Sequence, residues 1–93
     1  MKKQLLVSNL EVDMYGTKRW YNEVGELHRD GDLPAVEWKS GGKEWWINGI
    51  LDRENDLPTI VYVTGTTVWF NKSGVRYRID EWIDGDKAWY YEI

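Results

Sequence analysis

Pairs of adjacent aromatic residues recur along the 93-residue chain at intervals of about 24 residues. The pairs are Trp20-Tyr21, Trp45-Trp46, Trp69-Phe70 and Trp89-Tyr90. Glycines and arginines keep matching places after the first three pairs, at Gly25, Gly49 and Gly74 and at Arg29, Arg53 and Arg78. Such a period indicates one supersecondary unit stacked on itself. The chain is therefore predicted to form a single repeat domain over residues 1–93, with units at about 16–41, 42–64 and 65–84 and a partial unit at 85–93.

Each unit has the composition of β-structure, because Trp, Tyr, Val, Ile and Thr are abundant and no window keeps a helical period. Asn48-Gly49 is a strong hairpin-turn signal. The expected strands and the leading half-unit are Leu10–Tyr15, Lys18–Asn22, Ala35–Lys39, Lys43–Ile47, Thr59–Val63, Thr67–Asn71, Tyr77–Ile83 and Lys87–Ile93. The predicted fold is all-β, an antiparallel meander of about eight short strands built from three to four hairpin repeats.

The first unit carries a resemblance to a known class of repeats. It reads Gly-x-x-x-Trp-Tyr from Gly16, then Gly-x-Leu-His-Arg from Gly25 and Asp-Leu-Pro-Ala from Asp32. This pattern resembles the degenerate MORN-like repeats of bacteriophage and giant-virus proteins. The second unit has Asp52 in place of the histidine, and the third has no proline. The resemblance implies an interaction scaffold, here a small phage or mobile-element protein that binds and inhibits a host protein or defence complex.

A second resemblance concerns the stretch from Glu81 to Tyr91, which is similar to choline- and glycan-binding cell-wall repeats. It implies the alternative function, a module in which Trp and Tyr cages between successive hairpins hold a sugar or a quaternary amine.

Adjacent residues on a strand point to opposite faces of a sheet. One face is therefore expected to carry the first residue of each aromatic pair, and the other face the second residue. The second set, expected to contact a protein partner where it faces solvent, is Tyr21, Trp46, Phe70 and Tyr90. Two alternatives cover this set: closure of the sheet into a barrel or sandwich, or a homodimer that stacks two aromatic faces or pairs the last strand, Lys87–Ile93, with its copy.

The residues point away from catalysis. His28, the only histidine, aligns with Asp52 and Tyr77 of the later units, which is typical of a repeat residue. The arginines with Asp32, Asp56 and Asp80 recur in the same way and indicate structure. Carboxylate pairs such as Asp30 and Asp32 fall in predicted turns. We expect no enzyme activity, no catalytic residue and no cofactor, and without cysteine we expect no metal site.

The net charge of −4 makes a nucleic-acid partner unlikely, although the acidic terminal stretch leaves mimicry of nucleic acid as a third possibility. The apolar run Leu5-Leu6-Val7 is too short for an export signal, and no stretch approaches membrane length. These features predict a cytoplasmic protein with no membrane partner.

Overall fold

The computed structural model describes residues 9–83 and 86–91, with side chains over residues 9–80. The described residues form ten short strands and no helix. The strands are β1 (Leu10–Val12), β2 (Lys18–Trp20), β3 (Val36–Glu37), β4 (Lys43–Glu44), β5 (Trp46–Ile47), β6 (Ile50–Leu51), β7 (Ile60–Val61), β8 (Thr67–Phe70), β9 (Arg76–Ile83) and β10 (Asp86–Tyr91). No helix among the described residues has the length and apolar character needed to cross a membrane.

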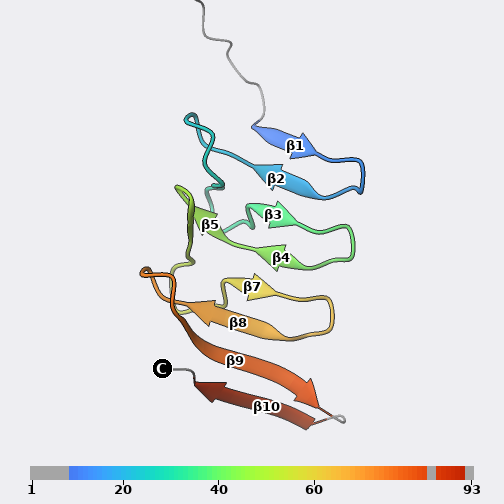
Figure 1. The fold of residues 1–93 in the computed structure, drawn as a ribbon, viewed down its shortest axis with the longest axis vertical. Coiled ribbons are helices and arrows are strands. Elements are labelled where there is room, and N and C mark those ends of the chain that lie inside the picture. The colour runs from blue at the N-terminus through green and yellow to red at the C-terminus, as the bar shows by residue number, and fades with distance from the viewer. Residues whose placement is uncertain (1–8, 84–85, 92–93) are drawn as a thin grey trace, which may run out of the picture.

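Eight of the strands form one antiparallel sheet in the order β1-β2-β3-β4-β7-β8-β9-β10 (Figure 1). β5 pairs with β6 in a separate hairpin. Each strand of the sheet lies beside the next one in this order, so the all-β antiparallel meander expected from the sequence is confirmed. The sheet is open, because β1 and β10 lie at its two ends. The closed barrel or sandwich considered above is therefore wrong.

The strand register assigns the side chains to two faces. Val36 lies opposite Glu44, Glu44 opposite Ile60, and Ile60 opposite Val68, so these residues share a face. We call it the aliphatic face, defined by Val36, Ile60, Val68 and Ile79. The tryptophans that follow Arg19, Glu44 and Val68 must point to the other side, so the tryptophan face carries Trp20, Trp45 and Trp69, as the sequence predicts. The side chains of Trp89 and Tyr90 lie outside the described part.

The core lies within this one sheet. The buried apolar residues include Val36, Val68 and Ile79 on one face and Trp45 and Trp69 on the other. Every buried side-chain nitrogen and oxygen in the described part has a hydrogen-bond partner.

Side chains of Asp and Asn fix the turns. The carboxylate of Asp13 accepts from the amides of Tyr15 and Thr17, and the amide oxygen of Asn22 accepts from those of Val24 and Glu26. Asn71 repeats the pattern with the amides of Ser73 and Val75. These local hydrogen bonds satisfy backbone amides at the turns, where the chain reverses and has no neighbouring strand to pair with.

One element differs from the sequence prediction. Lys43–Ile47 was expected to be a single strand, but it divides at Trp45 into β4, which pairs with β3 and β7, and β5, which pairs only with β6. The predicted Asn48-Gly49 turn closes this second hairpin, with both residues at positive φ, 48° and 80°. At the division, Trp45 lies under Arg53, its amide donates to the carbonyl of Thr59, and its carbonyl accepts from the amide of Asp52.

Candidate functional site

The tryptophan face is covered by arginines. The guanidinium carbon lies 3.7 Å from the ring centroid in the Arg29–Trp20 pair, 3.7 Å in the Arg53–Trp45 pair and 4.5 Å in the Arg78–Trp69 pair. At these distances a guanidinium stacks on an indole and is attracted by its π-electrons. Trp45 and Trp69 are each only 8% exposed. These rings therefore present little surface to a ligand.

Carboxylates hold the arginines in place. Arg53 binds Asp32 through two bonds, Nε–Oδ1 at 2.9 Å and NH2–Oδ2 at 3.2 Å. Arg29 pairs with Glu37 at 3.1 Å, and Arg78 pairs with Asp80. Because Asp32 comes from the segment before β3 and Arg53 from the segment after β6, their pair joins two successive units. The hydrogen bond that Asp32 accepts from Arg53 lowers the pKa of Asp32 below its ordinary value of 3.8.

The Asp-Leu-Pro segments receive further bonds. The indole Nε1 of Trp45 donates to the carbonyl of Asp32 at 3.0 Å, and that of Trp69 donates to the carbonyl of Asp56 at 2.9 Å. Arg53 also donates to the carbonyl of Pro58. Asp32 and Asp56 have positive φ, which turns these carbonyls toward the tryptophans. The recurring Arg, Trp and Asp are thus joined to one another, and this arrangement favours the structural interpretation given by the sequence.

His28 is likewise engaged by neighbours. Its Nδ1 accepts a hydrogen bond from the amide of Asn48 at 3.0 Å, and its Nε2 lies 2.8 Å from the carboxylate of Asp30. An Nδ1 that accepts must be unprotonated, so the neutral ring carries its proton on Nε2 and donates to Asp30. The histidine links the segment after β2 to the turn of the β5–β6 hairpin.

A cleft of about 270 Å³ lies beside these contacts. Its lining includes Asp30, Asp32, Trp45, Trp46, Asp52 and Arg53. A cage for a quaternary amine needs several open aromatic faces around one point. Here Trp45 is covered by Arg53, so Trp46 is the aromatic wall that stays available among the lining residues.

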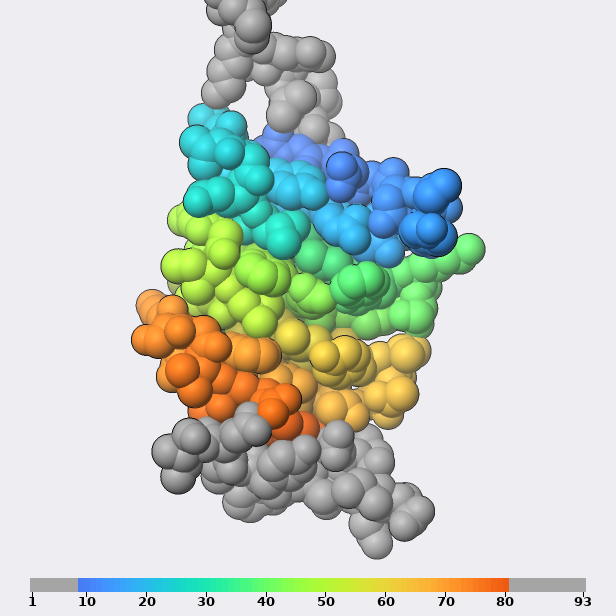
Figure 2. All heavy atoms as spheres, in the orientation of Figure 1, coloured from blue at the N-terminus to red at the C-terminus, as the bar shows by residue number. Residues whose placement is uncertain are grey.

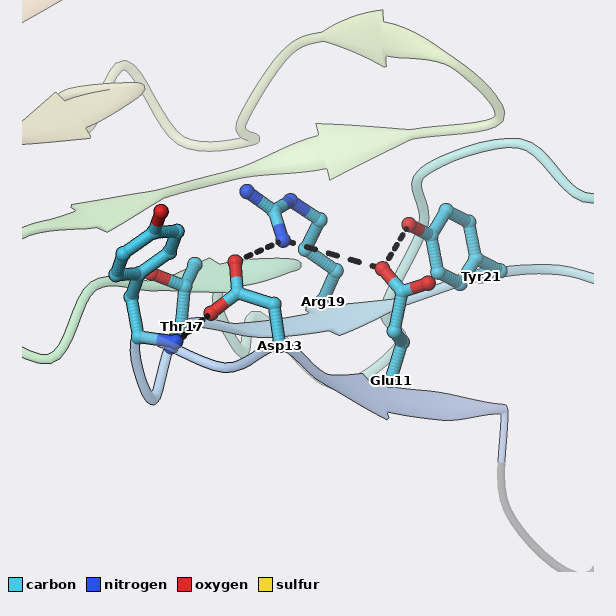
Figure 3. A network of polar contacts seen from close by, with 6 residues as sticks. Glu11, Asp13, Thr17, Arg19 and Tyr21 are labelled. Atoms are coloured by element: carbon cyan, nitrogen blue, oxygen red, sulfur yellow. Dashed lines mark hydrogen bonds and ion pairs between the residues drawn. The ribbon is translucent and has the colours of Figure 1, made fainter.

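The predicted contact residues Tyr21, Trp46 and Phe70 are all half-buried. The Tyr21 hydroxyl donates to Glu11 at 3.0 Å, and the Trp46 indole donates to Glu44 at 2.8 Å (Figure 3 shows the Tyr21 contact). Trp46 lies on the β5–β6 hairpin, whereas Phe70 ends β8 and Tyr21 follows β2. The structure therefore does not gather the three into one exposed cluster, and the side chain of Tyr90 lies outside the described part.

Six of the twelve large exposed apolar side chains in the described part lie instead at the turns that join strands at one end of the sheet. These turns join β1 to β2, β3 to β4 and β7 to β8, and they lie one above another in Figure 1. Their exposed fractions are 54% for Val12, 87% for Met14, 72% for Tyr15, 42% for Trp38, 48% for Tyr62 and 63% for Val63. We call these six residues the tip edge. In the space-filling view the same turns form the right-hand margin (Figure 2).

The tips share one turn geometry and touch each other. The amides of Gly16, Gly41 and Gly65 donate to the carbonyls of Asp13, Trp38 and Tyr62 at 3.0, 2.8 and 2.9 Å. A methyl group on Gly16 would lie 3.1 Å from Cδ of Lys39, and one on Gly41 would lie 3.5 Å from Cγ2 of Val63. Each turn therefore packs on the next, the first on the side chain of Lys39 and the second on Val63, and the tip edge is a ridge along the three turns.

A polar network holds the first tip (Figure 3). Arg19 donates to Asp13 at 2.9 Å and lies 3.9 Å from Glu11. The bond from Arg19 lowers the pKa of Asp13 below 3.8. Burial and the bond to Glu11 raise the pKa of Tyr21 above 10.0. Arg19 thus pairs with Asp13 and lies near Glu11 beneath this tip, and Met14 and Tyr15 are exposed beside the network.

The sequence contained a signal for the tip edge. Trp38 and Tyr62 stand three or four residues before a glycine in successive units, which is the spacing of a turn. The sequence prediction of contact residues used the aromatic pairs and not this spacing. In the described part of the chain, no group of three or more His, Cys, Asp or Glu side chains is placed to hold a metal ion. Comparison of the chain with family models, curated proteins and solved structures gives no match.

Proposed function

We propose that this chain is a non-enzymatic protein-binding module and that the tip edge is its contact surface. The observation that carries the proposal is the row of exposed aromatic and aliphatic side chains on three neighbouring turns. Contiguous apolar exposure of this kind marks interaction sites, since isolated exposed residues would be scattered. Trp and Tyr, which contribute Trp38, Tyr62 and Tyr15 here, are also the residues that most often dominate the binding energy of interfaces.

In this proposal the ridge is the contact surface, and the contact residues expected from the sequence, Tyr21, Trp46, Phe70 and Tyr90, stay an untested prediction. Tyr21 and Trp46 are half-buried, whereas Trp38, whose indole also donates to Glu44, is 42% exposed. A ligand cage is the weaker proposal because Arg29 and Arg53 already occupy faces of Trp20 and Trp45. Inhibition of a host protein, which the MORN-like resemblance implies, stays a prediction about the identity of the partner.

Affinity capture with matched variants tests the proposal. Wild-type protein, a Trp38→Ala/Tyr62→Ala double variant and a Val24→Ala/Val75→Ala double variant are immobilised and exposed to lysate of the native cells. Val24 and Val75 are the control because they are also exposed apolar residues, at 78% and 47%, but lie in the turns of the opposite edge. We expect one protein that the wild type and the control capture and the tip-edge variant loses. Equal capture by all three folded proteins would contradict the proposal.

A further inference from the structure

One contact between successive units has a defined set of donors. Arg53 donates to the carboxylate of Asp32 through Nε and NH2 and to the carbonyl of Pro58 through NH1. The indole Nε1 of Trp45, under the same guanidinium, donates to the main-chain carbonyl of Asp32 at 3.0 Å. One aspartate in a turn therefore satisfies both donor groups, with its carboxylate on the guanidinium edge and its carbonyl on the indole.

The same donors recur one unit earlier. Arg29 stacks on Trp20 at 3.7 Å, and its NH1 donates to the carbonyl of Pro34 and to the carboxylate of Glu37. The Nε and NH2 atoms of Arg29 form the edge that corresponds to the one bound by Asp32. Within the described part of the chain, neither this edge nor the indole Nε1 of Trp20 donates a hydrogen bond. The first unit thus has the donors of the contact without its acceptor.

The leading segment of the chain has no residue that could supply the matching carboxylate. Asp32 and Asp56 stand thirteen residues before the tryptophans that bind their carbonyls. Val7 stands thirteen residues before Trp20, and residues 1–8 contain neither Asp nor Glu. The carboxylate must therefore come from outside this segment.

A cleft gives access to these donors. It has a volume of about 460 Å³, and its lining includes Trp20, Tyr21 and Arg29. The equivalent residues of the second unit line the smaller cleft of about 270 Å³, together with Asp32. The two clefts therefore correspond to each other, one unit apart. A volume of several hundred Å³ is typical of a site for a small ligand and admits a short turn of peptide.

Negative charge beside the cleft does not prevent a carboxylate from binding there. The larger cleft has two carboxylates in its lining, those of Glu23 and Asp30. The smaller cleft has three besides that of Asp32, namely Asp30, Asp52 and Glu54. The pKa of Asp32 is nevertheless lowered by its bond from Arg53, so the carboxylate is bound in its ionised form. A guanidinium has five N–H donors, so Arg29 can bind a second carboxylate while it keeps Glu37.

We propose that Trp20 and Arg29 form a binding site for an aspartate-containing turn of a partner protein. The aspartate carboxylate accepts from Nε and NH2 of Arg29, and its main-chain carbonyl accepts from Nε1 of Trp20. A second copy of this chain is not the source of the turn, because the carboxylates of both its Asp-Leu-Pro segments, Asp32 and Asp56, are bound within the chain. None of the tip-edge residues lines the cleft, so the site is separate from the tip edge.

An NMR titration of the isotope-labelled wild-type protein tests the site. The probes are acetylated and amidated Gly-Asp-Leu-Pro-Ala, which copies residues 31–35, the same peptide with Asn in place of Asp, and acetate. We expect the Asp peptide to shift the side-chain N–H signals of Trp20 and Arg29 and to saturate with a Kd in the millimolar range. The Asn peptide and acetate should each bind at least about tenfold more weakly, because each lacks one of the two acceptors.

A matched pair of variants assigns the binding to Arg29. Arg29→Lys keeps the positive charge but removes the two-donor edge, so affinity for the Asp peptide should fall at least about tenfold. Arg53→Lys makes the same change one unit later and should leave that affinity unchanged. The comparison of the three probes needs no variant, so it decides the proposal even where a variant does not fold.

Several results would overturn the proposal. The Asp peptide could cause no shift of the Trp20 and Arg29 signals, or the Asn peptide could bind as tightly. Acetate that binds as tightly as the Asp peptide would assign a site for a lone carboxylate and not for a turn. Unchanged affinity of a folded Arg29→Lys protein would also contradict it. Lysate capture that depends on Trp38 and Tyr62 is a separate result, so the tip-edge proposal and this site can fail independently.

Discussion

Arg53 shows at the scale of one residue how this sheet is held without a second layer. Its plane lies on the ring of Trp45, its edge binds the carboxylate of Asp32, and a further N–H reaches the carbonyl of Pro58. Lysine cannot make these contacts together, because an ammonium group has neither a plane nor a fork of donors. The recurrence of an arginine eight or nine residues after a tryptophan in each of the first three units thus has a stereochemical reason.

Replacing this arginine with lysine is predicted to destabilise the fold although the charge is kept. Loss of the stack and of the paired bonds in Arg53→Lys should lower the free energy of unfolding by about 1–2 kcal/mol. Urea unfolding followed by tryptophan fluorescence measures it. Lys72→Arg, at an exposed turn position, is the matched control and should change little. An Arg53→Lys protein as stable as the wild type would show that the stack does not matter.

The bond between Arg53 and Asp32 also predicts a dependence on pH. A carboxyl whose pKa is lowered in the folded state contributes stability above its unfolded pKa, near 3.8, and loses the contribution as pH falls through the folded value. The stability advantage of the wild type over Asp32→Asn should therefore be constant above about pH 5 and shrink below it. Unfolding titrations of both proteins between pH 2 and pH 7 would measure this, and an advantage that grows on acidification would reverse the assigned sign.

The element scale is where the sequence was most informative. The Asn48-Gly49 signal fixes the β5–β6 hairpin, and β-rich runs between glycine turns locate the strands of the sheet to within a few residues. Local patterns carry this information because turn chemistry and alternation act over a few positions. The division at Trp45 was not foreseen, since it depends on Arg53 and Thr59, which approach from other parts of the chain.

A turn glycine gives the matching prediction. Gly25 has a φ of 86°, and a methyl group there would meet no heavy atom within 4 Å. Gly25→Ala should therefore destabilise by about 1 kcal/mol through backbone conformation alone. Chemical denaturation measures the change, and D-alanine at this position, introduced by chemical synthesis, should restore stability because it favours positive φ. Equal destabilisation by both alanines would point to a steric cause.

At the scale of the whole molecule, an open single-layer sheet leaves its edges and its ridge to other molecules. The meander could be predicted from the sequence, but the exposed surface could not. Alternation assigned Tyr21 and Trp46 to a face, whereas in the fold both are half-buried, and Tyr21 is bonded to Glu11 of the adjacent strand and Trp46 to Glu44 two residues earlier. The tip edge, in turn, arises from stacking of turns far apart in the chain, such as Val63 against Gly41.

The ends of the sheet give a prediction about assembly. β10 (Asp86–Tyr91) is an outermost strand, and unpaired strand edges tend to find partners. We expect a homodimer in which β10 pairs with its copy. Sedimentation equilibrium at micromolar concentration should give the mass of two chains, and deletion of residues 88–93 should give one. A wild-type mass of one chain would contradict the dimer.

Photo-crosslinking tests the central claim, that the tip edge binds a protein, most directly. A p-benzoylphenylalanine in place of Tyr15 places the reactive group on the ridge, and the same residue in place of Val24 places it on the opposite edge. After irradiation in lysate of the native cells, we expect one discrete cross-linked protein from position 15 and none from position 24. No adduct at position 15, or the same adducts from both positions, would contradict the claim.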